Sequence, residues 1–394
     1  MSDPAACPFV IASAREVRVA HGVRRTVAAS RAADAAAGAT QLLADSADDD
    51  ERAPGVVVGA LAFNPHHAPQ LFQPDAWHHP LPSSGAGYAV WPDRHAPAPR
   101  HWTVDAMPSR SGYERTVAAA LEEMAQPSAS PLRKVVLART LLLHADAPIN
   151  LAAVFARLSV DRAVHTFAVP LPPCQGGGRR VLIGATPELL AARHGGTVSS
   201  RPLAGSARRN ADASADRDAA EGLARSDKDL REHVTVVEWI ADRLAPYCRT
   251  LHVPKSPSLV STASMWHLGS TIEGTLHDPA VSALELAVAL HPTPAVCGAP
   301  FDRAAAFIDR EEPFDRDFYS GAVGWSDVNG DGEWYVAIRC AEVCGPSARL
   351  FAGAGIVIGS NPADEAAETS GKFVALLRAL GVDEEGRTFP GSEL

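Results

Sequence analysis

From residue 131 onward, the hydrophobic pattern alternates between segments typical of strands and segments typical of helices. The apolar run KVVLARTLLL at 134–143 predicts a strand, and LAAVFARLS at 151–159 predicts a helix. Residues 179–209 predict a strand, a turn and a second strand. A long helix capped by Ser226 is expected in SDKDLREHVTVVEWIADRLAPY, and a shorter helix in LELAVALHP that ends at its proline.

The C-terminal part predicts more strands. Two alternating apolar runs flank the turn sequence NGDG at 329–332 and predict a β-hairpin. The segment ARLFAGAGIVIG at 348–359 predicts a further strand. An open parallel sheet would show regular βαβ units, whereas here strand pairs are clustered between long helices. The pattern therefore predicts an α+β protein with substantial antiparallel sheet.

The N-terminal third gives weaker predictions. Residues 1–55 are rich in Ala, Asp and Arg, with an Ala-rich helical stretch followed by the loop sequence DSADDDERAPG. The run GVVVGALAF at 55–63 predicts a buried strand. Residues 66–110 carry many Pro and His residues and give no definite prediction, while residues 111–126 predict an amphipathic helix. We find no internal repeat, and no linker after residue 131.

Composition and charge narrow the classes of function. The chain has 394 residues, of which 46% are hydrophobic and 21% charged, as is typical of a globular protein. The formal net charge of -10 disfavours nucleic acid as a partner, but it allows a small anionic substrate held by a local cluster of cations. No apolar run reaches the ~18 residues of a membrane span, and no secretory signal is evident. We therefore expect a cytoplasmic protein without a membrane partner.

The cysteines are scattered through a long chain, without the density of a disulfide framework. Cys340 and Cys344 form a C-x3-C pattern that lacks the second pair of a zinc site. We expect reduced thiols at all six positions, Cys7, Cys174, Cys248, Cys297, Cys340 and Cys344.

The segment FAGAGIVIGSNPADEAAETSGKF, residues 351–373, combines a predicted glycine-rich turn, Gly353-Ala-Gly355, with charged positions. Its third glycine, Gly359, comes one residue too late for the dinucleotide-binding pattern G-x-G-x-x-G. Asn361 or Ser360 is expected to cap a helix that begins at Pro362.

On that helix, Glu365, Glu368 and Lys372 occupy positions i, i+3 and i+7, which share one face. Two interpretations stay open at this point. The first is a solvated acidic turn that complements the helix dipole. The second is a pair of carboxylates directed at a metal ion, with the bare N–H groups of the glycine turn offered to an anion.

Four further charged residues lie in or beside apolar segments. Lys134 begins a strand, and a lysine withdrawn from water can serve as a base. Glu188 leads into the leucines of GATPELL, and a carboxyl group in an apolar pocket can stay protonated and act as an acid. Arg339, expected in mid-strand, needs an anionic partner, and Glu232 lies on the long helix. Each also has an ordinary explanation, as a strand-edge lysine, a solvated carboxylate or a structural ion pair.

Other catalytic patterns are weak. Asp327, Asn329, Asp331 and Gly332 match the opening of a calcium-binding EF-hand loop, but Ile338 stands where a bidentate glutamate is required. We therefore expect a tight hairpin turn there. The sequence has no G-x-S-x-G elbow and no H-E-x-x-H, so serine-hydrolase and zinc-protease chemistry has no support.

Nine motifs, in a fixed order, resemble those of the chorismate-utilising enzymes. They are KVVLAR, GATPELL, RPLAGSARR, KDLREHVTVVEWI, WHLGSTIEG, LHPTPAVCG, EEPFDRDFYSGAVGW, GEWYVAIRC and LFAGAGIVIGSNPADEAAETSGKF. The resemblance is strongest to isochorismate synthases of the siderophore type. It implies one α+β domain over 1–394, with two stacked, mainly antiparallel sheets and helices outside. Residues 1–130 would be its variable N-terminal part and 131–382 its catalytic core.

The resemblance also implies a chemistry. Chorismate is the implied substrate and Mg²⁺ the implied cofactor. Lys134 resembles the base that activates water, and Glu188 resembles the acid that protonates the departing 4-hydroxyl group. Glu232 and Glu368 resemble the Mg²⁺ ligands, with Glu365 nearby through water.

Substrate-binding positions carry over in the same way. Arg339 and the backbone N–H groups of Gly205 and Gly355 resemble carboxylate binders, and Lys372 resembles a further contact near the metal-bound carboxylate. The remaining implied positions at the substrate are His267, Ala295 and Tyr319.

The implied reaction adds water at ring carbon C2 while the C4 hydroxyl group leaves and the double bonds shift. Because water is a poor nucleophile and hydroxide a poor leaving group, a base and an acid would each contribute ~10²–10⁴-fold. The implied product is isochorismate, and the implied Mg²⁺ would anchor one carboxylate of the substrate.

Two residues help to choose within the family. Lys134 favours water over ammonia as the nucleophile, since amino-transferring relatives lack a lysine there. Salicylate synthases, which go on to eliminate pyruvate, typically carry Thr at the position of Ala295 and Tyr at that of Tyr319. Ala295 therefore favours isochorismate synthase, while Tyr319 mildly favours salicylate synthase.

The alternative outside the enzymes is an inactive chorismate-binding scaffold. We expect a monomer, as relatives commonly are. The siderophore-type motifs favour 2,3-dihydroxybenzoate and siderophore biosynthesis as the consumer of the product, with salicylate-derived metabolites and menaquinone as alternatives.

Overall fold

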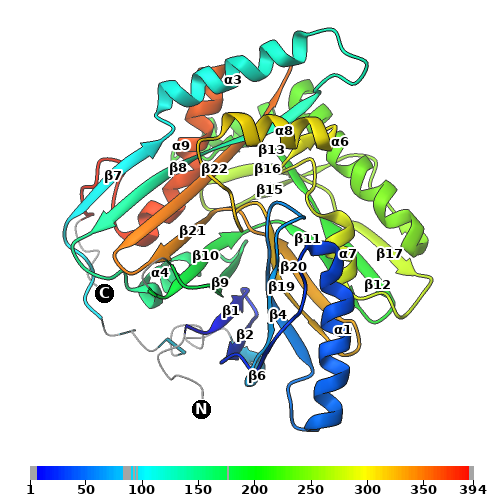
Figure 1. The fold of residues 1–394 in the computed structure, drawn as a ribbon. Coiled ribbons are helices and arrows are strands. Elements are labelled where there is room, and N and C mark those ends of the chain that lie inside the picture. The colour runs from blue at the N-terminus through cyan, green and yellow to red at the C-terminus, as the bar shows by residue number, and fades with distance from the viewer. Residues whose placement is uncertain (1–6, 83–89, 92–93, 95, 175–176, 390–394) are drawn as a thin grey trace.

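The structure is a computed structural model that describes residues 7–82, 90–91, 94, 96–174 and 177–389. Within these residues, two large sheets face each other, and helices cover their outer surfaces (Figure 1). Every described pair of strands is antiparallel, which confirms the predicted α+β class. The single domain expected over 1–394 stays a prediction, and residues 1–6 and 390–394 lie outside the described part.

The first large sheet has ten described strands, with β7 beside β8 and the others in the order β18-β8-β22-β21-β10-β9-β1-β2-β6. Their bounds are β1 (Phe9–Ala12), β2 (Glu16–His21), β6 (Ala76–Pro82), β7 (Trp102–Met107), β8 (Lys134–Ala145), β9 (His165–Leu171), β10 (Arg180–Thr186), β18 (Gly298–Ala299), β21 (Cys340–Cys344) and β22 (Ser347–Val357).

The second large sheet has nine described strands in the order β14-β17-β12-β11-β20-β19-β4-β5-β3. Their bounds are β3 (Arg25–Thr26), β4 (Val56–Leu61), β5 (Gln70–Gln73), β11 (Leu189–His194), β12 (Thr197–Arg201), β14 (Cys248–His252), β17 (Ile272–Leu276), β19 (Ala322–Asp327) and β20 (Gly332–Val336). A small third sheet, which the sequence did not predict, consists of β13 (Leu203–Arg208), β16 (Met265–Gly269) and β15 (Ser258–Ser261).

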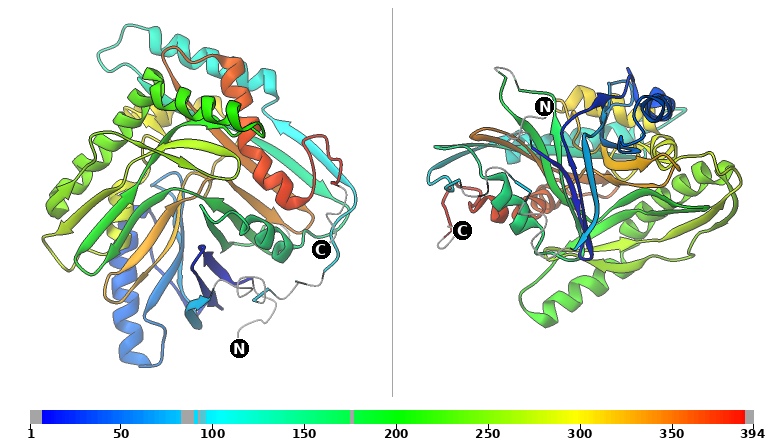
Figure 2. Two further views of the ribbon diagram at one scale, coloured as in Figure 1. Left: turned by 180° about the vertical axis from the view of Figure 1, so that it is seen from behind. Right: turned by 90° about the horizontal axis from the view of Figure 1, so that it is seen from below.

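Helices cover the outer faces of both large sheets. The first sheet packs against α3 (Arg110–Ala125), α4 (Leu151–Leu158), α8 (Phe301–Glu311) and α9 (Pro362–Leu380). The second packs against α1 (Ala32–Asp49), α6 (Asp227–Leu244) and α7 (Ala283–Leu290). Helix α5 (Ala213–Arg225) lies beside the third sheet, and the short helix η1 (Ala245–Tyr247) follows α6. In the left view of Figure 2, seen from behind, α9 (red) lies across the near face of the sheet that contains β22.

The strands contribute to separate hydrophobic layers through their two faces. In β4, Val57 packs toward the helices of the second sheet, while Val56 and Val58 pack between the two sheets. In β1, Val10 faces the helix layer and Phe9 faces the space between the sheets. Because both faces are buried, these strands are apolar without alternation, which explains the continuous run GVVVGALAF.

Most elements predicted from the pattern are confirmed. The predicted helices at 111–126 and 151–159 are α3 and α4, and the helix that ends before Pro292 is α7. Ser226 caps α6, because its side chain accepts a hydrogen bond from the N–H of Asp229. The hairpin at NGDG joins β19 to β20, and its turn is closed by N–H groups that donate to Asp327 Oδ1.

Three local predictions are wrong. Residues 179–209 form four strands, β10 to β13, because the chain changes sheet twice within them. Gly353 and Gly355 lie within β22 and not in a turn. Arg339 lies between β20 and β21, where a backbone φ of 51° redirects the chain from the second sheet to the first.

The prediction of six reduced thiols is also wrong, since Cys174 and Cys344 form a disulfide. Cys344 ends β21, and Cys174 lies in the connection between β9 and β10, whose strand β10 pairs with β21. The pattern gave no hint of this pairing because 170 positions separate the two cysteines. The other four, Cys7, Cys248, Cys297 and Cys340, are free thiols.

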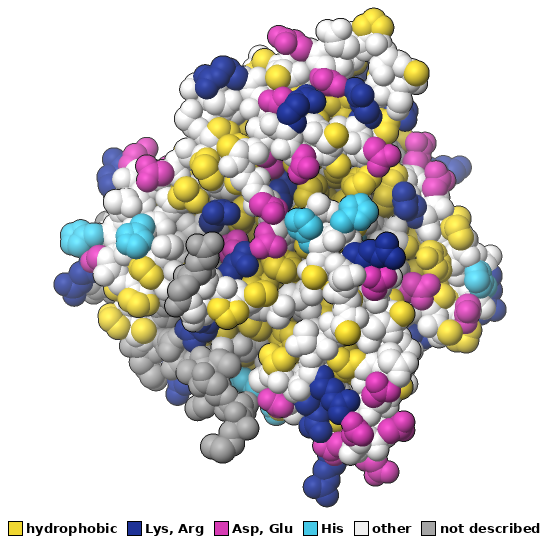
Figure 3. Space-filling view, viewed as in Figure 1, with side chains coloured by type: hydrophobic (Ala, Val, Ile, Leu, Met, Phe, Trp, Pro, Cys, Tyr) yellow, Lys and Arg dark blue, Asp and Glu magenta, His cyan; other side chains and the backbone are white. Residues whose placement is uncertain are grey.

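The described helices and the face shown in Figure 3 bear on two kinds of partner, membranes and nucleic acid. None of these helices combines the length and apolarity needed to cross a membrane. On the face shown in Figure 3, basic and acidic side chains are interspersed, and no continuous basic patch of the kind that binds nucleic acid is seen there.

Candidate active site

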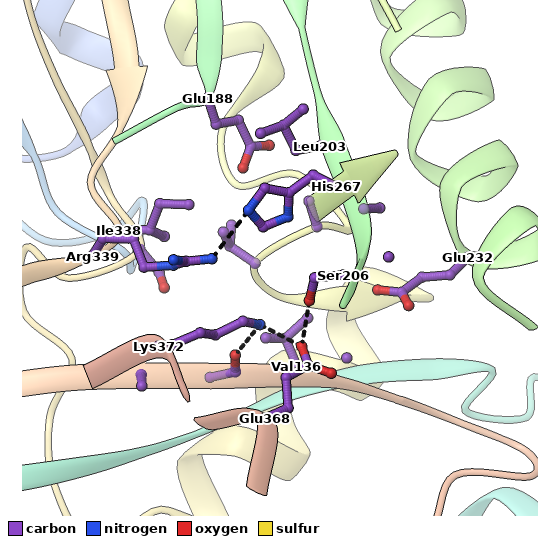
Figure 4. Close-up of a pocket in the computed structure, with 18 of the residues that line it drawn as sticks. Val136, Glu188, Leu203, Ser206, Glu232, His267, Ile338, Arg339, Glu368 and Lys372 are labelled. Carbon is purple, nitrogen blue, oxygen red and sulfur yellow. Dashed lines mark hydrogen bonds and ion pairs between the residues drawn. The ribbon is translucent and has the colours of Figure 1, made fainter. Parts of the chain in front are cut away.

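A cavity lies where the chain repeatedly crosses from one sheet to another (Figure 4). Three crossing connections contribute to its walls: Pro187 and Glu188 between β10 and β11, Leu203 at the start of β13, and Ile338 and Arg339 between β20 and β21. Strand β22, the first two turns of α6, and Glu368 and Lys372 of α9 contribute further walls. Side chains from distant parts of the sequence therefore converge on one space.

Glu188 enters the cavity as an isolated carboxyl group. It is 3% exposed, and its Oε1 has no hydrogen-bond partner among the described residues. Burial raises the pKa of Glu188 to about 7, although a hydrogen bond to the Leu203 backbone and the charges of Lys134, Arg339 and Lys372 act in the opposite direction. A carboxylic acid in this environment keeps its proton near neutral pH and can donate it.

Lys134 lies at the start of β8 and is 2% exposed, so it is not the strand-edge lysine of the simpler interpretation. Its Nζ is 2.9 Å from Glu232 Oε1 of α6. Both side chains pass over Gly355, where a Cβ atom would overlap the Glu232 carboxylate and lie 3.3 Å from Lys134 Cε. Glycine at this position therefore lets the Lys134 amine and the Glu232 carboxylate lie against β22, the strand that forms the floor of the cavity.

Arg339 is a buried cation without an anionic partner. It is 8% exposed, and within the described residues it makes no ion pair. Its Nη2 donates to His267 Nε2 at 3.3 Å (Figure 4). Burial, followed by the charges of Arg339 and Lys372, holds the pKa of His267 well below its usual value, so the imidazole is neutral. An unpaired buried guanidinium is costly, and an anionic ligand would satisfy it.

The backbone conformation of Arg339 also indicates that its guanidinium is placed to bind an anionic ligand. A positive φ is uncommon for a residue with a side chain and persists when the surroundings enforce it. Here, the conformation lies at the crossing between the sheets and directs the guanidinium toward the cavity (Figure 4).

Helices α6 and α9 each contribute carboxylates through their N-terminal halves. The Asn361 side chain accepts hydrogen bonds from Ala363 and Asp364 and caps α9, as predicted. Glu368 on α9 accepts a hydrogen bond from Ser206 and lies 2.6 Å from Lys372 Nζ. Lys372 Nζ also donates to the Gly353 carbonyl oxygen, which fixes the ammonium group over the floor.

The acidic groups of the two helices act on one another. Burial and then Glu368 raise the pKa of Glu365, while Lys228 opposes the change. Burial would also raise the pKa of Glu368, but the neighbouring Lys372 holds it below its usual value. Burial raises the pKa of Asp229, and the charges of Glu232 and Glu368 act in the same direction. The carboxylates of α6 and α9 are therefore close enough to repel one another electrostatically.

This donor set fits a magnesium ion in part. No three His, Cys, Asp or Glu side chains of the described residues are close enough to hold a metal ion by themselves. Mg²⁺, however, is usually bound by one or two carboxylates together with water and oxygens of the substrate. Mutually repelling carboxylates on α6 and α9 supply the hard oxygen ligands that this ion prefers.

The predicted substrate positions also reach the cavity. Gly205, with a φ of 81°, lies in a register shift of β13, and a Cβ atom there would be 3.0 Å from Asp229 Cβ. Tyr319 stacks on Phe351 with ring centroids 4.7 Å apart, and burial raises its pKa to about 12. Ala295 lines the wall beside it.

Gly353 and Gly355 keep backbone groups available although they lie in a strand. Opposite them on β8, the N–H groups of Ala138 and Val136 bond to Glu312 and to Cys297 instead of to β22. The two glycines therefore direct their own N–H and C=O groups away from β8, and β22 pairs with β21 only from Ser347 to Leu350. Gly355 can therefore offer its N–H group to an anion although it lies in a strand.

A buried ion pair, Arg316–Glu312, stabilises strand β8 beside the cavity. Arg316 donates to both carboxylate oxygens of Glu312 and to the carbonyl oxygens of Val136 and Val296, which belong to cavity-lining residues. Glu312 also accepts the N–H of Ala138 at 2.7 Å. The pair replaces strand-to-strand hydrogen bonds along β8, the strand that begins with Lys134.

We expect Glu312→Ala to lower the free energy of unfolding by about 3–5 kcal/mol, because it leaves the Arg316 charge buried and unpaired. Urea denaturation followed by circular dichroism measures the change. Glu311→Ala is the matched control, since Glu311 pairs with Arg310 at the surface and should cost less than ~1 kcal/mol. Equal effects of the two variants would contradict the supporting role.

Comparison with known proteins identifies the family. The family model described as "Chorismate binding enzyme" matches residues 91–381, which is more than half of the chain and includes every predicted site residue. The chain belongs to the chorismate-binding enzyme family.

Relatives in the family match over most of their lengths. Isochorismate synthase DhbC of Bacillus subtilis (strain 168) is 45% identical over 332 residues, covering 83% of this chain and 81% of that protein. A crystal structure of DhbC from Bacillus anthracis has a TM-score of 0.87 at 39% identity, covering 96% of this chain and 97% of that one. The menaquinone-specific isochorismate synthase MenF from Escherichia coli has a TM-score of 0.78 at 27% identity, covering 95% and 89%.

Ten of the twelve residues predicted from the motifs of the chorismate-binding enzymes line the cavity. The two exceptions adjoin it: Lys134 contacts Glu232, and Glu365 contacts Lys228. The sequence analysis did not name Lys228, although its position one turn before Glu232 places both residues on one face of α6. The other lining residues that the sequence did not place at a site are Val136, Pro187, Leu203, Ala204, Ser206, Asp229, Val296, Ser320, Ile338, Phe351 and Ala352.

Proposed function

We propose that this protein is an isochorismate synthase, an isomerase that converts chorismate to isochorismate with the help of Mg²⁺. The observation that carries the proposal is the placement of two unlike groups on one cavity. Glu188, an acid with a pKa of about 7, enters from the side opposite Lys372 and Glu368 (Figure 4). Lys134 adjoins the cavity beside Gly355.

The proposed substrate fits the charges of the cavity. Chorismate carries two carboxylates, and the cavity offers the unpaired guanidinium of Arg339 and the ammonium group of Lys372. The N–H groups of Gly205 and Gly355 would add donors for the same carboxylates. The apolar wall of Ile338 and Phe351 suits the ring.

In the proposed reaction, Lys134 Nζ accepts a proton from water as the water oxygen bonds to C2. The ring double bonds shift, the bond between C4 and its oxygen breaks, and Glu188 gives its proton to the departing hydroxyl group. One water is gained and one is lost, so the product is an isomer of the substrate. Lys134 can act as a base only when it leaves its contact with Glu232.

Glu232 and Glu368 would hold Mg²⁺, with Glu365 beside them, and the ion would neutralise and orient a substrate carboxylate. This assignment is supported by the repelling carboxylates of α6 and α9. We expect EDTA to abolish turnover and added Mg²⁺ to restore it. Loss of chorismate absorbance, measured with metal-free protein in a Mg²⁺ titration, checks this.

Product analysis separates the remaining possibilities. We expect chorismate to yield isochorismate, detected by liquid chromatography, without pyruvate in a lactate dehydrogenase assay. Salicylate with stoichiometric pyruvate would show a salicylate synthase instead. No turnover by folded, Mg²⁺-loaded protein would favour a chorismate-binding scaffold.

We further propose that the product supplies 2,3-dihydroxybenzoate for a siderophore. The proposal is supported by the 39% identity to DhbC of Bacillus anthracis, which is described as a putative 2,3-dihydroxybenzoate-specific isochorismate synthase. A strain without this gene should then grow poorly when iron is scarce, and 2,3-dihydroxybenzoate should restore its growth.

A further inference from the structure

Each carboxylate proposed for Mg²⁺ contacts a lysine. The three pairs are Lys134–Glu232 at 2.9 Å, Lys372–Glu368 at 2.6 Å and Lys228–Glu365 at 2.7 Å. The ammonium groups therefore contact oxygens that a divalent cation would use, and they offset the negative charge of these carboxylates.

Lys228 differs from the other two lysines in its access to solvent. Its side chain is 33% exposed, compared with 3% for Lys134 and 14% for Lys372. It lies in the first turn of α6, and its partner Glu365 lies in the first turn of α9 and is 3% exposed. A lysine on the rim of the cavity can turn outward without leaving an ammonium group buried and unpaired.

Lys228 is the member of this pair that reaches the cavity. Lys228 lines the cavity, whereas Glu365 does not, although its carboxylate accepts a hydrogen bond from Lys228 Nζ. A cation that approaches Glu365 from the cavity would therefore compete with this ammonium group for the carboxylate.

We propose that Lys228 competes with Mg²⁺ for Glu365 and thereby weakens metal binding by the free enzyme. The proposal rests on the proposed Mg²⁺ site and gives a function to a residue that the catalytic steps do not use. In the absence of metal, the ammonium group joins α6 to α9 and offsets the repulsion between Glu365 and Glu368. When the ion binds, Lys228 releases Glu365 and turns to solvent, so the two cations exchange at one carboxylate.

The test is Mg²⁺ binding by isothermal titration calorimetry, without substrate and at low ionic strength. Lys228→Met keeps the length of the side chain and removes its charge. We expect it to bind Mg²⁺ roughly 2- to 10-fold more tightly than the wild type, the range that follows from losing one partly exposed charge pair. Lys228→Arg, which keeps the charge, should stay within about twofold of the wild type.

Lys255→Met is the matched control, because Lys255 is exposed in the connection between β14 and β15 and makes no ion pair among the described residues, so the variant should leave the affinity unchanged. A second readout is thermal unfolding. In EDTA, Lys228→Met should melt below the wild type because the contact between α6 and α9 is lost, and Mg²⁺ should raise its melting temperature more than that of the wild type.

Equal or weaker Mg²⁺ binding by folded Lys228→Met would overturn the inference while leaving the proposed function intact. Conversely, tighter binding together with no isochorismate formation by the wild type would sink the proposed function and leave the competition at Glu365 standing. A wild-type protein that binds no Mg²⁺ would overturn both.

Discussion

Replacing Lys134 by alanine is expected to lower kcat for isochorismate formation by ~10³-fold, because water loses the base that accepts its proton. The amine has no substitute at its place on the cavity floor: it passes over Gly355, and the nearby Lys372 is bound to Glu368 and to the Gly353 carbonyl. The loss should appear in kcat more than in KM, since the proposed carboxylate contacts are made by other residues. Steady-state kinetics with purified protein measures both constants.

The fold should survive this change. Lys134 is buried beside Glu232, so its removal frees a carboxylate at the cavity rather than in the hydrophobic core. Circular dichroism and chorismate binding should resemble those of the wild type. Lys255→Ala, an exposed lysine far from the cavity in sequence, should keep full activity. Full activity of Lys134→Ala would contradict the assigned base.

Replacing Glu188 by glutamine is expected to lower kcat by a similar ~10²–10⁴-fold, because an amide of the same shape cannot give a proton to the departing hydroxyl group. The variant tests chemistry more than packing, since Glu188 Oε1 has no hydrogen-bond partner among the described residues. Stability should change little for the same reason. Glu273→Gln on β17, an exposed glutamate, is the control that should leave kcat unchanged.

The pH dependence gives this prediction a second measurement. Burial raises the pKa of Glu188 to about 7, so its acid form is present below that pH and is lost above it. In the wild type, kcat/KM should therefore fall as the pH rises through about 7 because of the free enzyme's acid. Glu188→Gln should lose this step from its residual rate, and an unchanged alkaline limb would assign the step to another group.

Much of the fold could be predicted because periodicity and caps act locally. Ser226 and Asn361 cap their helices through hydrogen bonds to N–H groups two or three residues ahead, so the sequence near each cap was sufficient. The hairpin between β19 and β20 could likewise be predicted from its turn sequence, NGDG. The third sheet was not, because β13 follows β12 after a single proline, and nothing local indicates that the chain changes partners there.

The candidate residues could be named from motifs, but their environments could not. The sequence left open whether Glu188 was a solvated turn carboxylate, and only burial by strands of different sheets makes it an acid with a raised pKa. Arg339 was predicted in mid-strand, whereas the positive φ that turns it into the cavity depends on the crossing between β20 and β21. Lys228 gained significance only when Glu365, 137 positions later, was found beside it.

The sequence by itself determined which helices and strands form, since side-chain period, caps and turns act over a few neighbouring residues, and it supplied the residue types of a proton donor, a proton acceptor and a set of carboxylates. The tertiary structure decided which of these side chains are removed from water and which face one another. That decision depends on long-range packing, because burial and pairing of charge arise where strands of two sheets and the first turns of α6 and α9 meet.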